Sequence, residues 1–287
     1  MSAKMHFAVI GDPIAHSLSP AMQNAGLAAL GLDADYVAIH VKADELPAFA
    51  EVARMELRGF NITVPHKGAI IPYLDEISDG ARLAGSVNTV SVVNGRLLGD
   101  STDGYGLESA ISESFDLGVR GSSICFIGCG GAVQAVAFHF AANGADRLFF
   151  LNRTVQTAQD IAERIQRHFP STRTFASSIT DLSAAADFLG SSKIAIQGTS
   201  LGLKPDDPSP IPPELLPDGI CLYETVYKRT RLLESAQGRG LRCANGLSML
   251  LHQGAKSLSI WTERHAPVEA MRKALYEAFA AREAGRN

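Results

Sequence analysis

A glycine-rich turn between two apolar segments is the feature that most constrains the fold of this chain. The first segment is residues 123–127, the turn reads Gly128-Cys129-Gly130-Gly131, and an alanine-rich stretch over 131–142 leads to a second apolar run at 147–152. Glycines at such a turn let the backbone approach a pyrophosphate, and the helix N-terminus that follows offers free N–H groups and a partial positive charge. The pattern predicts one βαβ unit of a dinucleotide-binding domain.

Length and composition set limits on the rest of the molecule. The chain has 287 residues, with 46% hydrophobic and 20% charged residues, which is typical of a globular protein and excludes intrinsic disorder. At about 150 residues per domain, two domains are expected. The formal net charge of −4 argues against a nucleic-acid partner.

Membrane association, a metal site and secretion are not expected. Residues 121–145 carry no Asp, Glu, Lys or Arg and are long enough to cross a bilayer, but five glycines and a central turn favour a strand–turn–helix. The four cysteines form no C-x-x-C pair and have no histidine at zinc-finger spacing. Because no secretory signal precedes the apolar residues 7–10, we expect a cytoplasmic protein with reduced thiols.

Short apolar runs alternate with amphipathic segments, which predicts an α/β fold with parallel sheets. Strands are expected at 7–10, 36–40, 59–64, 87–93, 96–99, 123–127, 147–152, 193–197 and 220–223, and helices at 19–30, 43–55, 131–142 and 154–169 with two more over 246–280. Asn94-Gly95 predicts a two-residue hairpin turn. We expect a catalytic domain at 1–104, a Rossmann-like domain at 105–244, and C-terminal helices at 245–287 that return to the first domain.

The end of the strand at 147–152 bears on the choice of dinucleotide. A site for NAD normally has Asp or Glu at this point to bind the ribose 2′-hydroxyl, whereas this chain reads Asn152-Arg153-Thr154. The planar guanidinium of arginine suits a 2′-phosphate, so NADP is favoured over NAD. The glycine pattern itself departs from the usual one, because Val133 fills the last position.

The first domain has more polar residues at strand ends than folding requires. They lie in the segments 16–20, 61–67, 86–89 and 99–104. Each has a simple structural alternative: Ser19 as a helix N-cap, Asp103 as the cap of a helix that begins at Gly104, and Lys67 as a surface charge.

Taken together, these segments resemble the shikimate dehydrogenase family along essentially the whole chain. The matching pieces are 11–20, 61–67, 84–89, 99–104, the glycine turn, 152–154 and 245–253. The resemblance implies an α/β protein with two domains: an N-terminal substrate domain completed by C-terminal helices, and a Rossmann-like dinucleotide-binding domain. It implies a monomer or homodimer that interconverts shikimate and 3-dehydroshikimate with NADP.

The resemblance also implies a role for particular residues. Lys67 and Asp103 would be the catalytic pair. The substrate would be held by Ser17, Ser19, Thr63, Asn88, Tyr227 and Gln253, the two serines at its carboxylate and the two amides at ring hydroxyls. The cofactor would be held by Gly128, Gly130, Gly131, Ala132, Asn152, Arg153, Thr154, Thr199 and Gly246.

Two alternatives remain open at this point, and several departures from the family bear on them. The protein could be a quinate/shikimate dehydrogenase of broader specificity that uses NAD or NADP, or a non-catalytic dinucleotide-binding sensor. The loop 227–233 looks about two residues shorter than in the family and carries three cations, a difference that bears on ligand preference or on cleft closure. Glu224, Gln197 and Ser101 are conservative replacements of the usual Asp, Asn and Asn.

Overall fold

The computed structural model describes residues 4–204 and 206–284, which form two compact units. Unit 1 takes the chain up to Gly106 and again from Leu250, and unit 2 is Leu107–Met249. The unit boundaries fall inside two helices, α5 (Asp103–Phe115) and α10 (Leu247–Thr262). Each unit contains one six-stranded sheet, so the α/β class expected from the sequence is confirmed.

The sheet of unit 1 is mixed, with the strand order β2-β1-β3-β5-β6-β4. Its strands are β1 (Met5–Gly11), β2 (Ala34–His40), β3 (Gly59–Ile62), β4 (Glu76–Ile77), β5 (Thr89–Val93) and β6 (Arg96–Asp100). β1 lies parallel to β2 and β3, while β5 runs antiparallel to β3 and β6. The predicted hairpin turn is confirmed, because Asn94 and Gly95 both have positive φ, at 52° and 74°.

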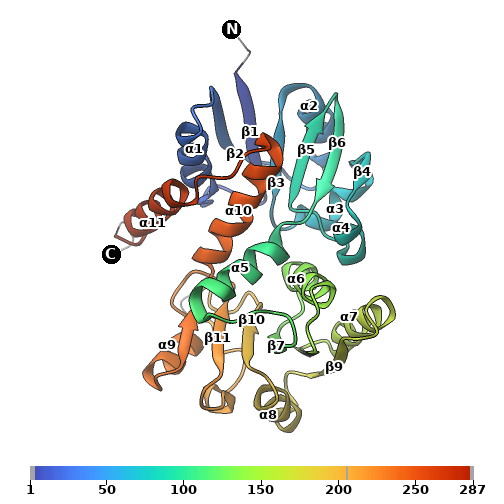
Figure 1. The fold of residues 1–287 in the computed structure, drawn as a ribbon, viewed down its shortest axis with the longest axis vertical. Coiled ribbons are helices and arrows are strands. Elements are labelled where there is room, and N and C mark those ends of the chain that lie inside the picture. The colour runs from blue at the N-terminus through green and yellow to red at the C-terminus, as the bar shows by residue number, and fades with distance from the viewer. Residues whose placement is uncertain (1–3, 205, 285–287) are drawn as a thin grey trace. The chain divides into compact units, whose positions relative to one another are not determined.

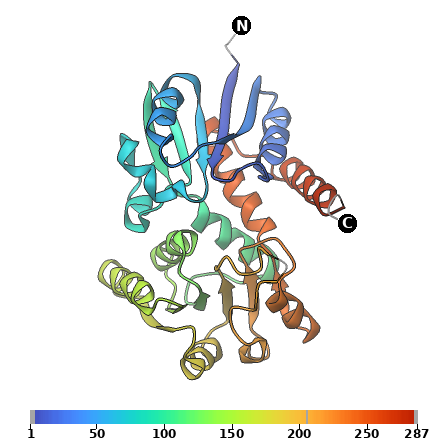
Figure 2. The ribbon, with the colours of Figure 1, turned by 180° about the vertical axis from the view of Figure 1, so that it is seen from behind.

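Helices cover the two faces of this sheet (Figures 1 and 2). They are α1 (Ser19–Ala29), α2 (Leu46–Glu56), the short α3 (His66–Ala69) and α4 (Asp79–Ala84), the start of α5, most of α10, and α11 (Val268–Ala284). Leu46, Ala50 and Ala53 of α2 pack against Phe60 and Val90 on one face. On the other face the Trp261 indole of α10 stacks on Phe7 at 5.0 Å, and α11 packs beside α1. The site described below is therefore built on a sheet that is anchored on both sides.

The sheet of unit 2 is parallel throughout, with the order β12-β11-β10-β7-β8-β9. Its strands are β7 (Ser123–Ile127), β8 (Arg147–Asn152), β9 (Arg173–Ser178), β10 (Ile194–Gln197), β11 (Cys221–Glu224) and β12 (Arg242–Ala244). The helices are α6 (Gly131–Ala142), α7 (Val155–His168), α8 (Leu182–Gly190) and α9 (Arg231–Gly238). This is the doubly wound order of dinucleotide-binding folds, and its switch point lies between β7 and β10, where ligands bind.

One expectation needs correction, and another is confirmed. The helix α1 begins at Ser19, so Ser19 is its first residue and Leu18 is the N-cap, without a side-chain cap bond. The segment 121–145 forms β7 and α6, and among the described residues no helix is both long and apolar enough to cross a membrane.

Candidate active site

Lys67 and Asp103 form a short contact in unit 1. Lys67 follows the first residue of α3, and Asp103 is the first residue of α5. The Lys67 Nζ donates to Asp103 Oδ2 at 2.5 Å, and the two side chains are only 17% and 5% exposed. A carboxylate this buried requires charged or hydrogen-bonding partners, and Lys67 supplies a charged one.

Asn88 connects this pair to α10. Its Nδ2 donates to Asp103 Oδ1 at 2.9 Å and lies 3.2 Å from Gln253 Oε1. Its Oδ1 accepts the backbone N–H of Thr102 at 2.8 Å. Because that N–H can only donate, it fixes the amide orientation and turns the NH₂ group toward Asp103 and Gln253. The structure thus brings Lys67, Asn88, Asp103 and Gln253 into one cluster.

The loop before α1 places the two serines of the sequence motif. Ser17 Oγ accepts the backbone N–H of Ser19 at 3.2 Å, and the Ser19 hydroxyl bonds to Tyr36, whose pKa burial raises well above its usual range. From α11, Arg282 Nη1 donates to the carbonyl of His16 at 2.8 Å and so holds this loop. Thr63 follows β3 in unit 1 and turns its γ-methyl toward the α-carbon of Gly11, where a Cβ would lie 2.6 Å away.

A second layer of polar residues lies behind the cluster, and sequence reasoning did not single these residues out. The Tyr36 hydroxyl donates to Asn61 Oδ1 at 2.8 Å, and Asn61 Nδ2 donates to the backbone carbonyl of Asn88 at 3.0 Å. The layer consists of Tyr36, Asn61, Thr89, Thr102 and Ser257, all buried. Asn61, Thr89 and Thr102 lie inside the motifs that carried the resemblance, and Ser257 follows Gln253 by four residues, which is the spacing of one helix face.

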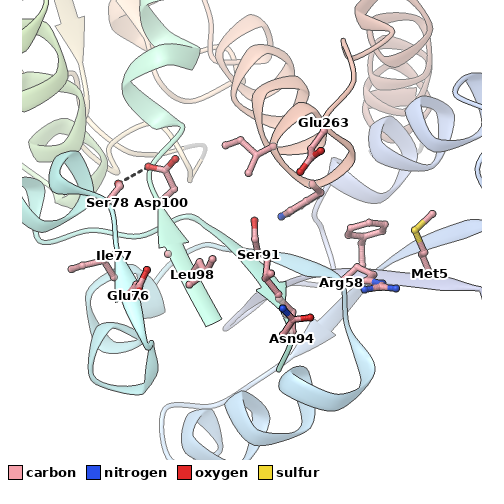
Figure 3. Close-up of a pocket in the computed structure, with 16 residues that line it drawn as sticks. Met5, Arg58, Glu76, Ile77, Ser78, Ser91, Asn94, Leu98, Asp100 and Glu263 are labelled. Carbon is pink, nitrogen blue, oxygen red and sulfur yellow. Dashed lines mark hydrogen bonds between the residues drawn. The ribbon is translucent and has the colours of Figure 1, made fainter. Parts of the chain in front are cut away.

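A hollow of about 600 Å³ opens on the sheet of unit 1, and its lining includes none of the four residues of this cluster. Figure 3 shows it lined by Glu76, Ser91, Leu98 and Asp100 from β4, β5 and β6, with Glu263 above them. Asp100 Oδ1 accepts from the Ser78 hydroxyl at 2.6 Å. None of the predicted site residues lines this hollow.

In unit 2, the glycine turn after β7 leads directly into the N-terminus of α6. Gly128 has φ +95°, and a Cβ there would lie 2.5 Å from Thr199 Cγ2, so only glycine fits. Gly130 is the N-cap of α6, and because glycine has no side chain it cannot cap the first N–H groups of the helix. Gly131 and Ala132 are the first two residues of the helix, and the space around the α-carbon of Gly131 is open. The first N–H groups of α6 therefore remain available to an anion such as a pyrophosphate.

The departure at Val133 has a structural explanation. A Cβ on Gly198, just after β10, would lie 2.1 Å from Val133 Cγ2. The third glycine of the usual pattern allows close helix–strand packing. Here the valine is on the helix and the glycine is on the neighbouring strand end, so the close approach is kept.

At the end of β8, Asn152 is hydrogen-bonded to the backbone, whereas the next side chain, Arg153, is exposed. Asn152 Oδ1 accepts the Cys129 N–H at 3.2 Å, and Asn152 Nδ2 donates to the Thr154 carbonyl at 2.9 Å. Thr154 is the N-cap of α7 without a side-chain cap bond. Arg153 is exposed and has no hydrogen bond or ion pair within the part of the chain that the structure describes.

Three further residues of unit 2 shape the ends of β10 and β11. Gln197 is fully buried and spans the following turn, because its Oε1 accepts the Thr199 N–H and its Nε2 donates to the Leu201 carbonyl at 3.0 Å. Tyr227 follows β11 and is partly buried. Gly246 packs so closely behind it that a Cβ would lie 2.1 Å from the Thr225 carbonyl oxygen.

Glu224, at the end of β11, is the most perturbed carboxyl near this loop. Its Oε1 accepts from the Thr230 hydroxyl at 2.7 Å, and its buried Oε2 has no hydrogen-bond partner. Burial raises the pKa of Glu224 to about 7, and the bond from Thr230 opposes this shift. Lys228 of the short loop donates to the Leu203 carbonyl.

Comparison with known proteins decides the family. The models "Shikimate dehydrogenase substrate binding domain", "Shikimate / quinate 5-dehydrogenase" and "Shikimate 5'-dehydrogenase C-terminal domain" match residues 9–90, 110–199 and 246–276. A shikimate dehydrogenase (NADP(+)) of Desulfitobacterium hafniense is 40% identical over 96% of this chain and 98% of its own length. The chain belongs to the shikimate dehydrogenase family.

Solved structures of the family agree with this fold. Shikimate 5-dehydrogenase from Listeria monocytogenes, in complex with shikimate and NAD, has a TM-score of 0.89 at 34% identity and covers 96% of this chain and 97% of its own. The family member from Thermus thermophilus, in complex with NADP(H) and shikimate, has a TM-score of 0.84 at 35% identity and covers 96% and 99%. The expected arrangement of a substrate domain and a Rossmann-like domain is confirmed.

Proposed function

We propose that this chain is an NADP-dependent shikimate dehydrogenase, which interconverts shikimate and 3-dehydroshikimate. The observation that carries the proposal is the short contact between Lys67 and Asp103, joined through Asn88 to Gln253. In this cluster an amine that is able to transfer a proton lies with two amides that are able to bind hydroxyls, and this supports the proposal. The full-length relative named for the same activity supports the assignment.

The residues of unit 2 fit NADP. The uncapped N-terminus of α6 after Gly130 suits the pyrophosphate, and the exposed, unpaired Arg153 with Thr154 suits a 2′-phosphate. We assign Gly128, Gly130, Gly131, Ala132, Asn152, Thr199 and Gly246 to the same binding surface. When bound, the nicotinamide supplies the hydride acceptor or donor.

We assign to Lys67 the transfer of the proton of the reacting hydroxyl. In the direction of carbonyl reduction, the Lys67 ammonium donates a proton to the oxygen, and in the reverse direction the neutral amine takes it back. Asp103 accepts a hydrogen bond from Lys67 and so holds its Nζ in one place. A group held in position contributes more than a mobile one, because the orientation is fixed before reaction.

The remaining residues bind and orient the substrate. Ser17 and Ser19, with Thr63 and Tyr227, would donate to the carboxylate. Asn88 and Gln253 would hold ring hydroxyls, since each is a neutral amide whose orientation the surrounding bonds determine.

Domain assignment, compartment and assembly extend the same proposal. Residues 1–104 with 245–287 would form the substrate domain and 105–244 the cofactor domain. We place the protein in the cytoplasm, where its four free cysteines stay reduced, as a monomer or homodimer.

The test is the reduction of NADP and of NAD, followed by absorbance, with shikimate and with quinate. We expect turnover with shikimate and NADP to exceed the other three combinations. Higher kcat/KM with quinate would indicate the broader enzyme, and NADP binding without turnover of either acid would indicate a sensor. Either result would reject the proposed function.

A further inference from the structure

Ser257, in the middle of α10, lies where the hydrogen bonds behind the site meet. The residue is 0% exposed. Its hydroxyl donates to the Gln253 carbonyl at 2.9 Å, so its oxygen serves the other neighbours as an acceptor. Asn61 Nδ2 donates to it at 3.0 Å, and the Thr89 and Thr102 hydroxyls lie 2.8 and 3.3 Å away.

The two threonines transmit this arrangement to Asn88. Both Thr89 Oγ1 and Thr102 Oγ1 also reach Asn88 Oδ1, at 3.0 and 3.2 Å. Each hydroxyl has one proton and can direct it to only one acceptor at a time. Ser257 therefore influences which of the two threonine hydroxyls donates its hydrogen bond to Asn88 Oδ1. These hydrogen bonds in turn affect how firmly Asn88 Nδ2 is held against Asp103.

The same residue fixes the position of α10 along the sheet. Gln253, Ser257 and Trp261 are spaced by four residues and share one helix face. At the far end, Trp261 Nε1 donates to the Val90 carbonyl at 2.9 Å, and its indole fills the space that a Cβ on Gly59 would need. Ser257 is the middle anchor, and Gln253 lies one turn from it at the site.

We propose that Ser257 is a positioning residue for the reaction, which acts by ordering Thr89 and Thr102 so that Asn88 faces Asp103 and Gln253. This role rests on the proposed function. Ser257 need not touch the substrate. Its removal takes one acceptor away from Asn61, Thr89 and Thr102, so that their hydrogen bonds must be redistributed among the remaining acceptors, which include Asn88 Oδ1.

The experiment compares Ser257→Ala with Ser259→Ala. Ser259 is on the same helix, and its hydroxyl oxygen accepts the Ala266 N–H at 3.1 Å, at the end of the helix away from the site. Ser259→Ala therefore also removes one serine hydroxyl and one hydrogen bond, but not at the site. We expect Ser257→Ala to lower kcat/KM for shikimate by roughly tenfold or more, with the dissociation constant for NADP unchanged. Ser259→Ala is expected to leave both values at the wild-type level.

Two further variants separate positioning from stability. If Ser257→Ala does not fold, Thr89→Val removes the adjoining hydroxyl with little change of shape, and the same loss is expected from it. Ser257→Thr keeps the hydroxyl and is expected to restore most of the activity. Equal kcat/KM in Ser257→Ala and Ser259→Ala, or a loss that follows only their thermal unfolding midpoints, would overturn the proposal.

The wild-type assay keeps the two hypotheses apart. Turnover of shikimate by the wild type with no specific loss in Ser257→Ala rejects the positioning role alone. Absence of turnover in the wild type rejects the proposed function and, with it, the role of Ser257.

Discussion

The Nζ of Lys67 lies 2.5 Å from Oδ2 of Asp103, while Asn88 Nδ2 binds the other carboxylate oxygen at 2.9 Å. Asp103 thus has a fixed partner on each oxygen, one charged and one neutral. In this arrangement the carboxylate is held on both oxygens and in turn holds the Lys67 Nζ in place, which suits the proton transfer proposed for Lys67. Asp103 is accordingly assigned the role of orienting Lys67 and a substrate hydroxyl.

Replacing Lys67 is expected to remove the chemical step. For Lys67→Ala we expect kcat to fall by about 10²–10⁴-fold, the usual contribution of a positioned proton-transfer group. The dissociation constant for NADP should stay near the wild-type value, because the residues proposed to bind the cofactor lie in unit 2. Steady-state kinetics and a cofactor titration measure the two effects.

Lys42→Ala is the control for a lost lysine charge, since Lys42 is an exposed residue of the same unit. Thermal unfolding of both variants shows whether the uncompensated Asp103 destabilises the fold. Near-wild-type turnover of Lys67→Ala would contradict the assignment.

Arg153 is expected to decide the preference for NADP. A charge-assisted bond to phosphate is typically worth about 1.5–3 kcal/mol, so Arg153→Ala should raise KM for NADP roughly tenfold or more and leave KM for NAD almost unchanged. Arg167→Ala removes an exposed arginine from the last turn of α7 and serves as the control. Equal changes of KM for the two cofactors would show that Arg153 does not contact the 2′-phosphate.

The pairing of Val133 with Gly198 is testable by a double-mutant cycle. Gly198→Ala places a Cβ 2.1 Å from Val133 Cγ2 and is expected to weaken NADP binding by displacing the start of α6. Val133→Ala removes the opposing methyl groups, so the double variant should recover most of the lost affinity. Additive effects of the two substitutions would mean that the residues do not interact.

The parts of the fold that the sequence predicted well are those that the local residue pattern determines. The bounds of β7, α6 and β8 agree residue for residue with the prediction, because an apolar strand, a glycine turn and an uncharged helix all specify the same structure. The strands β9 and β12 were not predicted. They lie at the edges of the sheet and are partly exposed, so pairing with β8 and β11 determines them more than their own residue pattern does.

The candidate site likewise contains residues that the sequence predicted and residues that it did not. Residues such as Lys67 and Asp103 stood out because charged groups lie beside strand ends in recognisable motifs. Ser257 did not stand out in the sequence, because its hydrogen bond to Asn61 joins residues that are 196 positions apart. A lone serine in a helix has no local signal, and only the packing of α10 on the sheet gives it its partners.

Glu224 should make stability depend on pH. Its folded pKa of about 7 lies above the ordinary value of 4.5, so the folded state binds the proton more tightly than the unfolded state. The associated stabilisation is fully present below pH 4.5 and is lost as the pH rises through 7. A shift of this size corresponds to a free energy on the order of 3 kcal/mol.

Glu224→Gln isolates this contribution, because glutamine keeps an oxygen for the Thr230 hydroxyl and cannot ionise. We expect the unfolding free energy of the variant, relative to wild type, to increase steadily between pH 5 and pH 8 in urea titrations. Other titrating groups are common to both proteins and cancel in the difference. A difference that does not change with pH would mean that Glu224 is already ionised in the folded protein at pH 5, in spite of its burial and the lack of a partner for Oε2.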